Sequence, residues 1–215
     1  MNMMNNKINL QNFDDETIKN AFQSGTTTVG IIIKDGVVMG TESQATAGTV
    51  VASKTTQKLF EINKYTAATT AGGVADCQYI INQLRAISRL REVEKEQVPD
   101  PKYIASITRN ILFSGRTYFI SMMLVGGFSL TEKSGKLYGV DLLGTLYEEN
   151  EYISFGSGSS FTLGVLEADW KPNMSKTAGI DLIKTAISTS RERDVGSGYE
   201  FQICTIDKNG YKQVD

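Results

Sequence analysis

Apolar residues along this chain change their spacing in long blocks, and the order of the blocks limits the possible folds. Alternate spacing, typical of strands, dominates up to residue 72, and a 3.6-residue spacing, typical of helices, begins near Val74. Two helices follow there, strands return, and a second helix pair precedes a last strand. Because the helices come in pairs, the order disfavours a doubly wound parallel sheet. It favours an α+β fold with two mostly antiparallel sheets and a helix pair on each outer face.

The individual elements follow from the same pattern. Expected strands, several bounded by turn residues such as Asp35-Gly36, cover 26–34, 37–41, 58–62, 65–71, 120–126, 136–140, 144–147, 152–155 and 200–206. The first expected helix has an apolar face, and Pro99 and Pro101 separate it from the second. The third ends near Trp170 and the fourth in the charged run 191–194. A loop is expected at 42–48, and a weakly structured leader, with a short helix from Asp14, at 1–25.

The chain has no histidine among its 215 residues, so it cannot use catalysis built on imidazole. That excludes Ser-His-Asp and Cys-His machinery, and two cysteines, Cys77 and Cys204, cannot supply four metal ligands. A net charge of −2 gives no basic excess for nucleic acid or an anionic membrane, and no apolar run could span a bilayer. We expect a reduced, cytoplasmic setting. Any hydrolase chemistry would need a carboxylate, a lysine or an α-amine as its base.

The stretch Gly25-Thr26-Thr27-Thr28-Val29-Gly30 could supply such a base. If the chain were cut before Thr26, this threonine would carry a free α-amine, whose pKa of about 8 suits a general base near neutral pH. An adjacent amine can activate the otherwise poor hydroxyl nucleophile of the same residue. The alternative is an ordinary β-strand, since threonine and isoleucine are good strand formers.

Short motifs are distributed over the whole chain after residue 24: Gly25-Thr26-Thr27-Thr28-Val29-Gly30, Lys34-Asp35-Gly36-Val37-Val38, Thr41-Glu42, Lys58-Leu59-Phe60, Ala71-Gly72-Gly73, Val125-Gly126-Gly127, Gly156-Ser157-Gly158-Ser159, Gly164-Val165-Leu166-Glu167 and Arg193-Asp194-Val195-Gly196-Ser197-Gly198. Their order and spacing resemble the β subunit of a 20S proteasome, and the archaeal type is the most similar. The resemblance implies the four-layer αββα sandwich of N-terminal-nucleophile hydrolases. It also implies a threonine endopeptidase subunit of the core particle that needs no cofactor or metal. Residues 1–25 would be a propeptide, removed autocatalytically between Gly25 and Thr26, and 26–215 the peptidase domain.

The resemblance also assigns roles to single residues. Thr26 would be the nucleophile, Lys58 would stabilise its developing alkoxide, and Glu42 would hold Lys58 in place. The backbone N–H of Gly72 would form the oxyanion hole. A polar cluster that orients the threonine amine and a water would comprise Ser157, Asp194 and Ser197. The alternatives are solvated surface charges for Glu42 and Lys58 and plain turns or loops for the others.

The resemblance further implies a substrate-binding surface. Thr46, Gly48 and Gly72 would pair with the substrate backbone as an added strand. The primary specificity pocket would comprise Ala45, Thr56, Phe60, Thr70 and Val74, none of which is charged. We therefore expect an apolar side chain at P1, the substrate residue that precedes the cut. Gln44 departs from the family, since many members have a basic residue there, and could alter the Glu42–Lys58 geometry or the pocket charge.

The implied partners are α-subunits and other β-subunits in stacked seven-membered rings. Unfolded polypeptide substrates would be delivered by an ATPase regulator, and neither nucleic acid nor a membrane is expected. Two other functions remain open. One is a structural ring subunit that assembles without cutting, although such members often lose the residues that match Thr26 or Lys58. The other is an amidase for small molecules. It would lack the helix pair that starts near Val74 and Pro101, which resembles the helices that contact neighbours in the family's rings.

Overall fold

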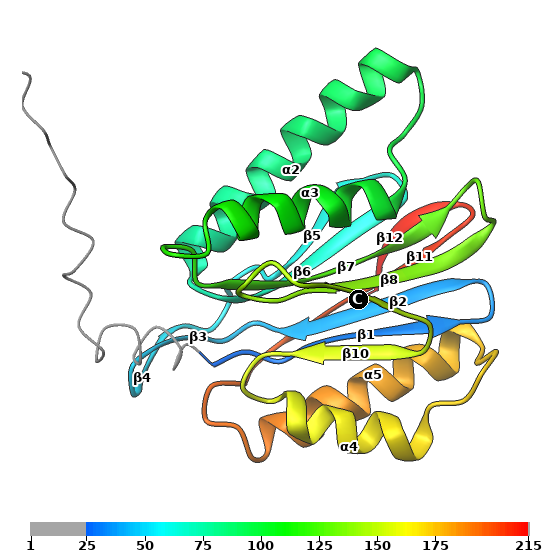
Figure 1. Cartoon of the computed structure of the whole chain (residues 1–215). Helices are drawn as coiled ribbons and strands as arrows, with labels where there is room; N and C mark the ends of the chain where they lie inside the picture. The colour runs from blue at the N-terminus through cyan, green and yellow to red at the C-terminus, as the bar shows by residue number, and fades with distance from the viewer. Residues whose placement is uncertain (1–24, 215) are drawn as a thin grey trace, which may run out of the picture.

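The computed structural model describes residues 25–214, and these residues form four layers (Figure 1). The first sheet contains, in spatial order, β10 (Tyr152–Phe155), β1 (Thr28–Ile33), β2 (Gly36–Glu42), β11 (Phe201–Asp207) and β12 (Gly210–Val214). The second contains β5 (Leu59–Asn63), β6 (Thr66–Gly72), β7 (Ser121–Ser129), β8 (Ser134–Val140) and β9 (Leu146–Glu149). Neighbouring strands in both sheets are antiparallel. The predicted αββα class is confirmed.

A pair of helices covers the outer face of each sheet (Figure 1). Helices α2 (Val74–Lys95) and α3 (Pro101–Ser114) pack on the second sheet, and α4 (Ser159–Asp169) and α5 (Lys176–Arg191) on the first. The start of α3 is fixed by the Asp100 side chain, which accepts a hydrogen bond from the backbone N–H of Lys102, and by proline at the first helical position. Ser175 caps α5 in the same way. Thus the local sequence sets where these helices begin.

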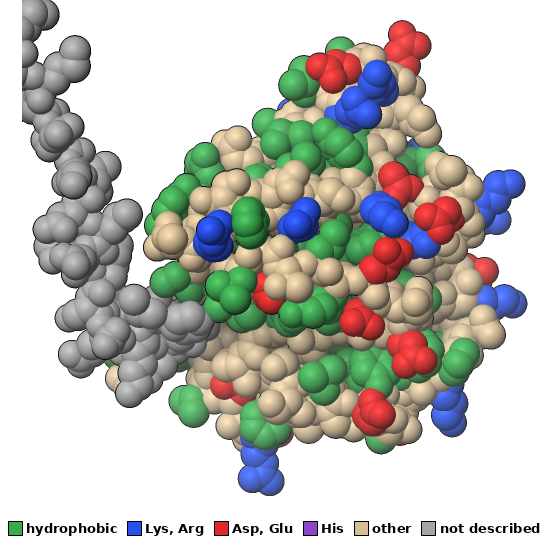
Figure 2. Space-filling view, in the orientation of Figure 1, with side chains coloured by type: hydrophobic (Ala, Val, Ile, Leu, Met, Phe, Trp, Pro, Cys, Tyr) green, Lys and Arg blue, Asp and Glu red, His purple; other side chains and the backbone are tan. Residues whose placement is uncertain are grey.

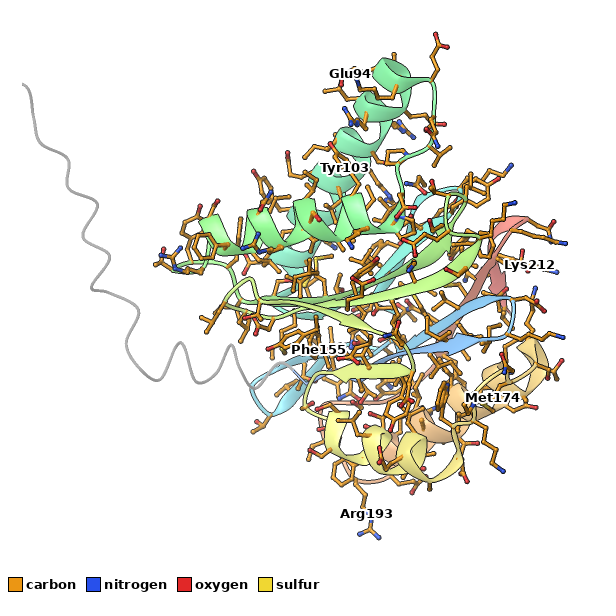
Figure 3. The ribbon with its side chains drawn as sticks, turned by 45° about the vertical axis from the view of Figure 1, so that its right-hand side comes forward. Glu94, Tyr103, Phe155, Met174, Arg193 and Lys212 are labelled. Atoms are coloured by element: carbon orange, nitrogen blue, oxygen red, sulfur yellow. The ribbon has the colours of Figure 1, made fainter. Side chains whose placement is uncertain are left out.

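Three apolar clusters hold the layers together. One joins α2 and α3 to the second sheet, one joins α4 and α5 to the first, and the third fills the space between the sheets. Figure 3 labels a partly buried member of each, namely Tyr103, Met174 and Phe155. The sheets approach closely at glycines: a Cβ on Gly30 would lie 2.6 Å from Leu137 Cδ1, and one on Gly126 would lie 2.5 Å from Met39 Sδ. Both glycines belong to the motifs noted above.

Three short strands differ from the sequence-based expectation. The predicted loop at 42–48 contains a short strand, β3 (Ala45–Ala47), which pairs with β4 (Val50–Ser53) in a separate hairpin. The chain also returns after the turn at 208–210 to form β12, where no strand was predicted. The other strands and helices lie within a few residues of their predicted positions. The leader and its expected helix lie outside the described residues.

The described surface has no strongly basic or acidic region on the face shown in Figure 2, where side chains of both signs are interspersed. Among residues 25–214, none of the helices combines the length and apolarity needed to cross a membrane.

Candidate active site

One end of the sandwich gathers the residues that the motifs singled out. Thr26 lies two residues before β1, Glu42 is the last residue of β2, and Lys58 directly precedes β5. Antiparallel pairing of β1 with β2 places Thr28 opposite Thr41, which brings Thr26 and Thr27 near Glu42. The chain segments that meet here lie near the β3–β4 hairpin in Figure 1. Lys58 reaches this point from the other sheet, across sequence separations of 16 residues to Glu42 and 32 residues to Thr26.

Lys58 lies between a hydroxyl and a carboxylate. Its Nζ is 3.0 Å from Thr26 Oγ1 and 2.5 Å from Glu42 Oε1. Lys58 and Glu42 are 4% and 0% exposed, so neither is a solvated surface charge. The Glu42 carboxylate also accepts hydrogen bonds from the backbone N–H groups of Thr27, Gln44 and Gly198. Four donors therefore compensate its burial, which is the condition under which a buried charge is tolerated.

Burial lowers the pKa of the Lys58 ammonium below its usual value, and the attraction of the adjacent Glu42 carboxylate only partly reverses this shift. Lys58 donates to Thr26 Oγ1, and that hydroxyl in turn donates to the Gly25 carbonyl at 2.6 Å. A cation in this position stabilises negative charge on the hydroxyl oxygen, and its lowered pKa eases proton exchange with the same atom.

A second polar cluster lies on the other side of Thr26. The backbone N–H of Thr26 donates to Ser157 Oγ at 3.1 Å, and Ser157 Oγ donates to Asp194 Oδ2 at 2.6 Å. Ser197 Oγ donates to the same Asp194 oxygen at 2.6 Å. The structure thus joins all three predicted cluster residues by hydrogen bonds, and Ser157 links them to the nitrogen that would become the α-amine after cleavage.

A pocket open to solvent adjoins Thr26 and Lys58. Its walls include the predicted residues Ala45, Thr46, Thr56, Phe60, Thr70, Gly72 and Val74, and also Gln44, Gln57, Cys77 and Gln78. Gly48 is the exception, because it lies outside these walls in the β3–β4 turn with a φ of +59°. At Gly72, φ is +118° and a Cβ would lie 2.3 Å from the Ile120 carbonyl oxygen, so only glycine fits there.

Sequence reasoning missed Gln202 on β11. Its Oε1 accepts hydrogen bonds from the backbone N–H groups of Lys58 and Leu59, and its Nε2 donates to the Thr56 carbonyl. One side chain thus fixes the backbone on both sides of Lys58. Nothing in the local sequence around residue 202 signals this contact, because the partner is 144 residues away.

Gln44 and Cys77 also have defined surroundings. Gln44 donates through Nε2 to the Val195 carbonyl, and the Glu42–Lys58 ion pair forms beside it. Burial raises the pKa of the Cys77 thiol, which keeps it protonated and a poor nucleophile at neutral pH. No group of three His, Cys, Asp or Glu side chains in the described part of the chain is arranged to hold a metal ion.

The four-layer frame, with these residues at one end of its sheets, defines the fold class of N-terminal-nucleophile hydrolases. Comparison with known sequences is more specific. The family described as "Proteasome subunit" matches residues 22–206. "Proteasome subunit beta" of Archaeoglobus profundus is 39% identical over 199 residues, covering 92% of this chain and 91% of the relative. The chain therefore belongs to the proteasome subunit family.

Two further archaeal relatives support the same assignment. "Proteasome subunit beta" of Methanocaldococcus vulcanius is 39% identical over 189 residues, covering 87% of this chain and 84% of the relative. That of Archaeoglobus fulgidus is 36% identical over 197 residues, covering 91% and 92%. The resemblance to the archaeal β type is confirmed, and family membership makes the chain a component of a peptidase that assembles from proteasome subunits.

Proposed function

We propose that the mature chain is a threonine endopeptidase of the 20S core particle and that Thr26 is its nucleophile. The observation that carries this proposal is the buried Lys58 ammonium, 3.0 Å from Thr26 Oγ1 and paired with Glu42. A lysine cation beside a hydroxyl favours the ionised form of that hydroxyl. A non-catalytic ring subunit has no use for such a buried pair, whose desolvation costs several kcal/mol per ion.

In the proposed reaction the free α-amine of Thr26 takes the proton from its own hydroxyl, and Oγ1 attacks the substrate carbonyl carbon. Lys58 stabilises the alkoxide, and the Gly72 N–H stabilises the oxyanion of the tetrahedral intermediate. The amine then passes the proton to the leaving nitrogen, which gives an ester between substrate and Thr26. Water, oriented by the Ser157, Asp194 and Ser197 cluster, attacks this ester and releases the product acid.

The site would operate inside an assembled particle. Seven-membered β-rings stacked between α-rings would place it in an interior chamber, which limits a protease of low sequence selectivity to unfolded polypeptides supplied by an ATPase regulator in the cytoplasm. Thr46 and Gly72 would pair with the substrate backbone. Gly48 would also pair with the substrate backbone, from the β3–β4 turn outside the pocket walls.

Co-expression with proteasome α-subunits from a related archaeon tests this function. We expect a large stacked-ring particle by size exclusion and negative-stain imaging, and cleavage of fluorogenic peptides by that particle. Thr26→Ala should assemble equally and show no cleavage, because it retains the fold and lacks the hydroxyl. A particle that forms but does not cleave would favour the structural subunit, and a monomer that hydrolyses small amides would favour the amidase.

The pocket walls predict which substrates are cleaved. Apart from Lys58, which is paired with Glu42, no lining side chain carries a charge. We expect peptides with leucine or tyrosine at P1 to be cleaved at least about 5-fold faster than those with glutamate, since an unpaired buried charge costs about 1–3 kcal/mol or more. Rates with a matched peptide series measure this. Thr70→Val should keep the preference, Thr70→Lys should raise glutamate cleavage, and equal wild-type rates would contradict the assigned pocket.

A further inference from the structure

Thr27 lies at the centre of a buried chain of hydroxyl groups, and the proposed reaction gives no role to Thr27 or to Ser190. Its Oγ1 is 2.6 Å from Ser190 Oγ on α5 and 2.6 Å from Ser197 Oγ. Thr27 and Ser190 are 0% exposed and Ser197 is 5% exposed. Because solvent does not reach these hydroxyls, their protons must be shared among the groups present.

Counting protons fixes the direction of every hydrogen bond in this series of hydroxyl groups. Ser197 donates to Asp194 Oδ2, which uses the single proton of its hydroxyl. The bond between Thr27 and Ser197 must therefore be a donation from Thr27. Thr27 has then used its own proton, and the remaining bond must be a donation from Ser190. The order of donation is Ser190 to Thr27 to Ser197 to Asp194.

The acceptor end of this hydrogen-bonded series, Asp194, belongs to the candidate active site. Asp194 also accepts from Ser157, and Ser157 accepts from the nitrogen of Thr26. The Thr27 backbone joins the other half of the site, since its N–H donates to Glu42 Oε1 and its carbonyl accepts from Thr41 Oγ1 at 2.9 Å. Every polar atom of Thr27 is therefore bonded, and the residue connects the Lys58–Glu42 pair to the Asp194 cluster.

The surrounding backbone leaves no room for other side chains at this junction. A Cβ on Gly158 would lie 1.9 Å from Ser190 Oγ and 2.0 Å from Thr27 Oγ1. The glycine therefore lets the loop before α4 close directly over the hydroxyl pair. This packing restricts Thr27 Oγ1 to its two partners, which makes the direction of donation a fixed property of the folded chain.

We propose that Thr27 is a positioning residue, whose hydroxyl fixes Ser197 and Asp194 so that Ser157 holds the Thr26 nitrogen in place. This inference rests on the proposed function of Thr26. Ser190 is the first donor of the hydroxyl series and donates only to Thr27. Its loss therefore leaves every bond from Thr27 to the site intact. The two residues are equally buried and should differ strongly in their effect on catalysis.

Variants in the assembled particle test the inference. We expect Thr27→Val, which keeps the shape and removes the hydroxyl, to lower kcat about 10- to 100-fold, the scale of a misplaced catalytic group, and to leave KM within about twofold. Thr27→Ser should restore kcat to within about threefold of wild type, because it restores the donor. Ser190→Ala should keep kcat within about threefold and still lower the melting temperature, though by less than Thr27→Val, since Ser190→Ala loses one buried hydrogen bond and Thr27→Val loses two.

Three outcomes would overturn the inference. They are full kcat in Thr27→Val, failure of Thr27→Ser to restore kcat, and a loss of kcat in Ser190→Ala equal to that in Thr27→Val. The last would show that both hydroxyls act only through stability. If Thr27→Val is not matured, a chain that starts at Thr26 after removal of an N-terminal fusion supplies the mature variant for the same assay. Wild type and Thr26→Ala are run in parallel, and an inactive wild type or an active Thr26→Ala would contradict the proposed function instead.

Discussion

Lys58→Ala is expected to abolish both peptide cleavage and removal of residues 1–25. Both reactions need an activated Thr26 hydroxyl, and in both the developing negative charge lies within hydrogen-bonding reach of Lys58 Nζ. Loss of one such donor typically costs about 10²–10³ in rate. Lys58 also neutralises the charge of Glu42, so we expect a loss of at least about 10³-fold. Initial rates with a fluorogenic peptide and the intact mass of the subunit measure the two reactions separately.

The controls must separate chemistry from folding. Removing Lys58 alone leaves Glu42 buried without its counter-charge, which destabilises proteins by roughly 3–5 kcal/mol. The double variant Lys58→Met, Glu42→Gln removes both charges and keeps similar volumes, so we expect it to assemble and remain inactive. Lys171→Ala alters an exposed lysine between α4 and α5 and should match wild type. If Lys58→Ala matures at the normal rate, Lys58 has only a structural role.

Much of the frame could be predicted from local signals. Asp35-Gly36 marks the β1–β2 hairpin, and the change of period near Val74 marks α2. The β3–β4 hairpin could not be predicted in this way, because β3 has only three residues and they are small and partly exposed. β12 follows its turn with mostly polar, partly exposed residues, which weakens the alternation that identifies strands.

The site was harder to predict than the frame, because its geometry depends on pairing across the sheets. The sequence does not show that Glu42 and Lys58 are buried against one another, and the resemblance to a family supplied that pairing. The resemblance did not supply Gln202 or Ser190, whose contacts are side-chain hydrogen bonds across 144 and 163 residues. Each lies in a strand or helix where an ordinary exposed polar residue would fit the local pattern equally well.

A chain that retains Gly25 is expected to be inactive as a peptidase. In the described chain the Thr26 nitrogen is an amide that donates to Ser157, so it has no lone pair available as a base. The Thr26 hydroxyl donates to the Gly25 carbonyl at 2.6 Å, and Lys58 donates to that hydroxyl. The carbonyl that must be attacked during maturation therefore already lies against the nucleophile.

Maturation would begin when Thr26 Oγ1 attacks the Gly25 carbonyl carbon, with Lys58 stabilising the charge and water carrying the hydroxyl proton. The C–N bond then breaks, the nitrogen takes a proton, and an ester joins Gly25 to Oγ1. Water hydrolyses this ester, which releases residues 1–25 and frees the α-amine that the peptidase reaction needs. The leader would thus prevent cleavage of other chains until its own removal creates the base.

Intact mass and peptidase activity, followed together before and after particle assembly, test this order of events. We expect activity to rise in proportion to the fraction of subunits that begin at Thr26, and Thr26→Ala to retain the leader. Gly25→Ala should mature at least about 10-fold more slowly, since its Cβ would lie 2.0 Å from the Gly196 Cα and displace the carbonyl from the hydroxyl. Full activity from a particle whose subunits all keep residues 1–25 would exclude Thr26 as an N-terminal nucleophile, because an amide nitrogen cannot accept the proton.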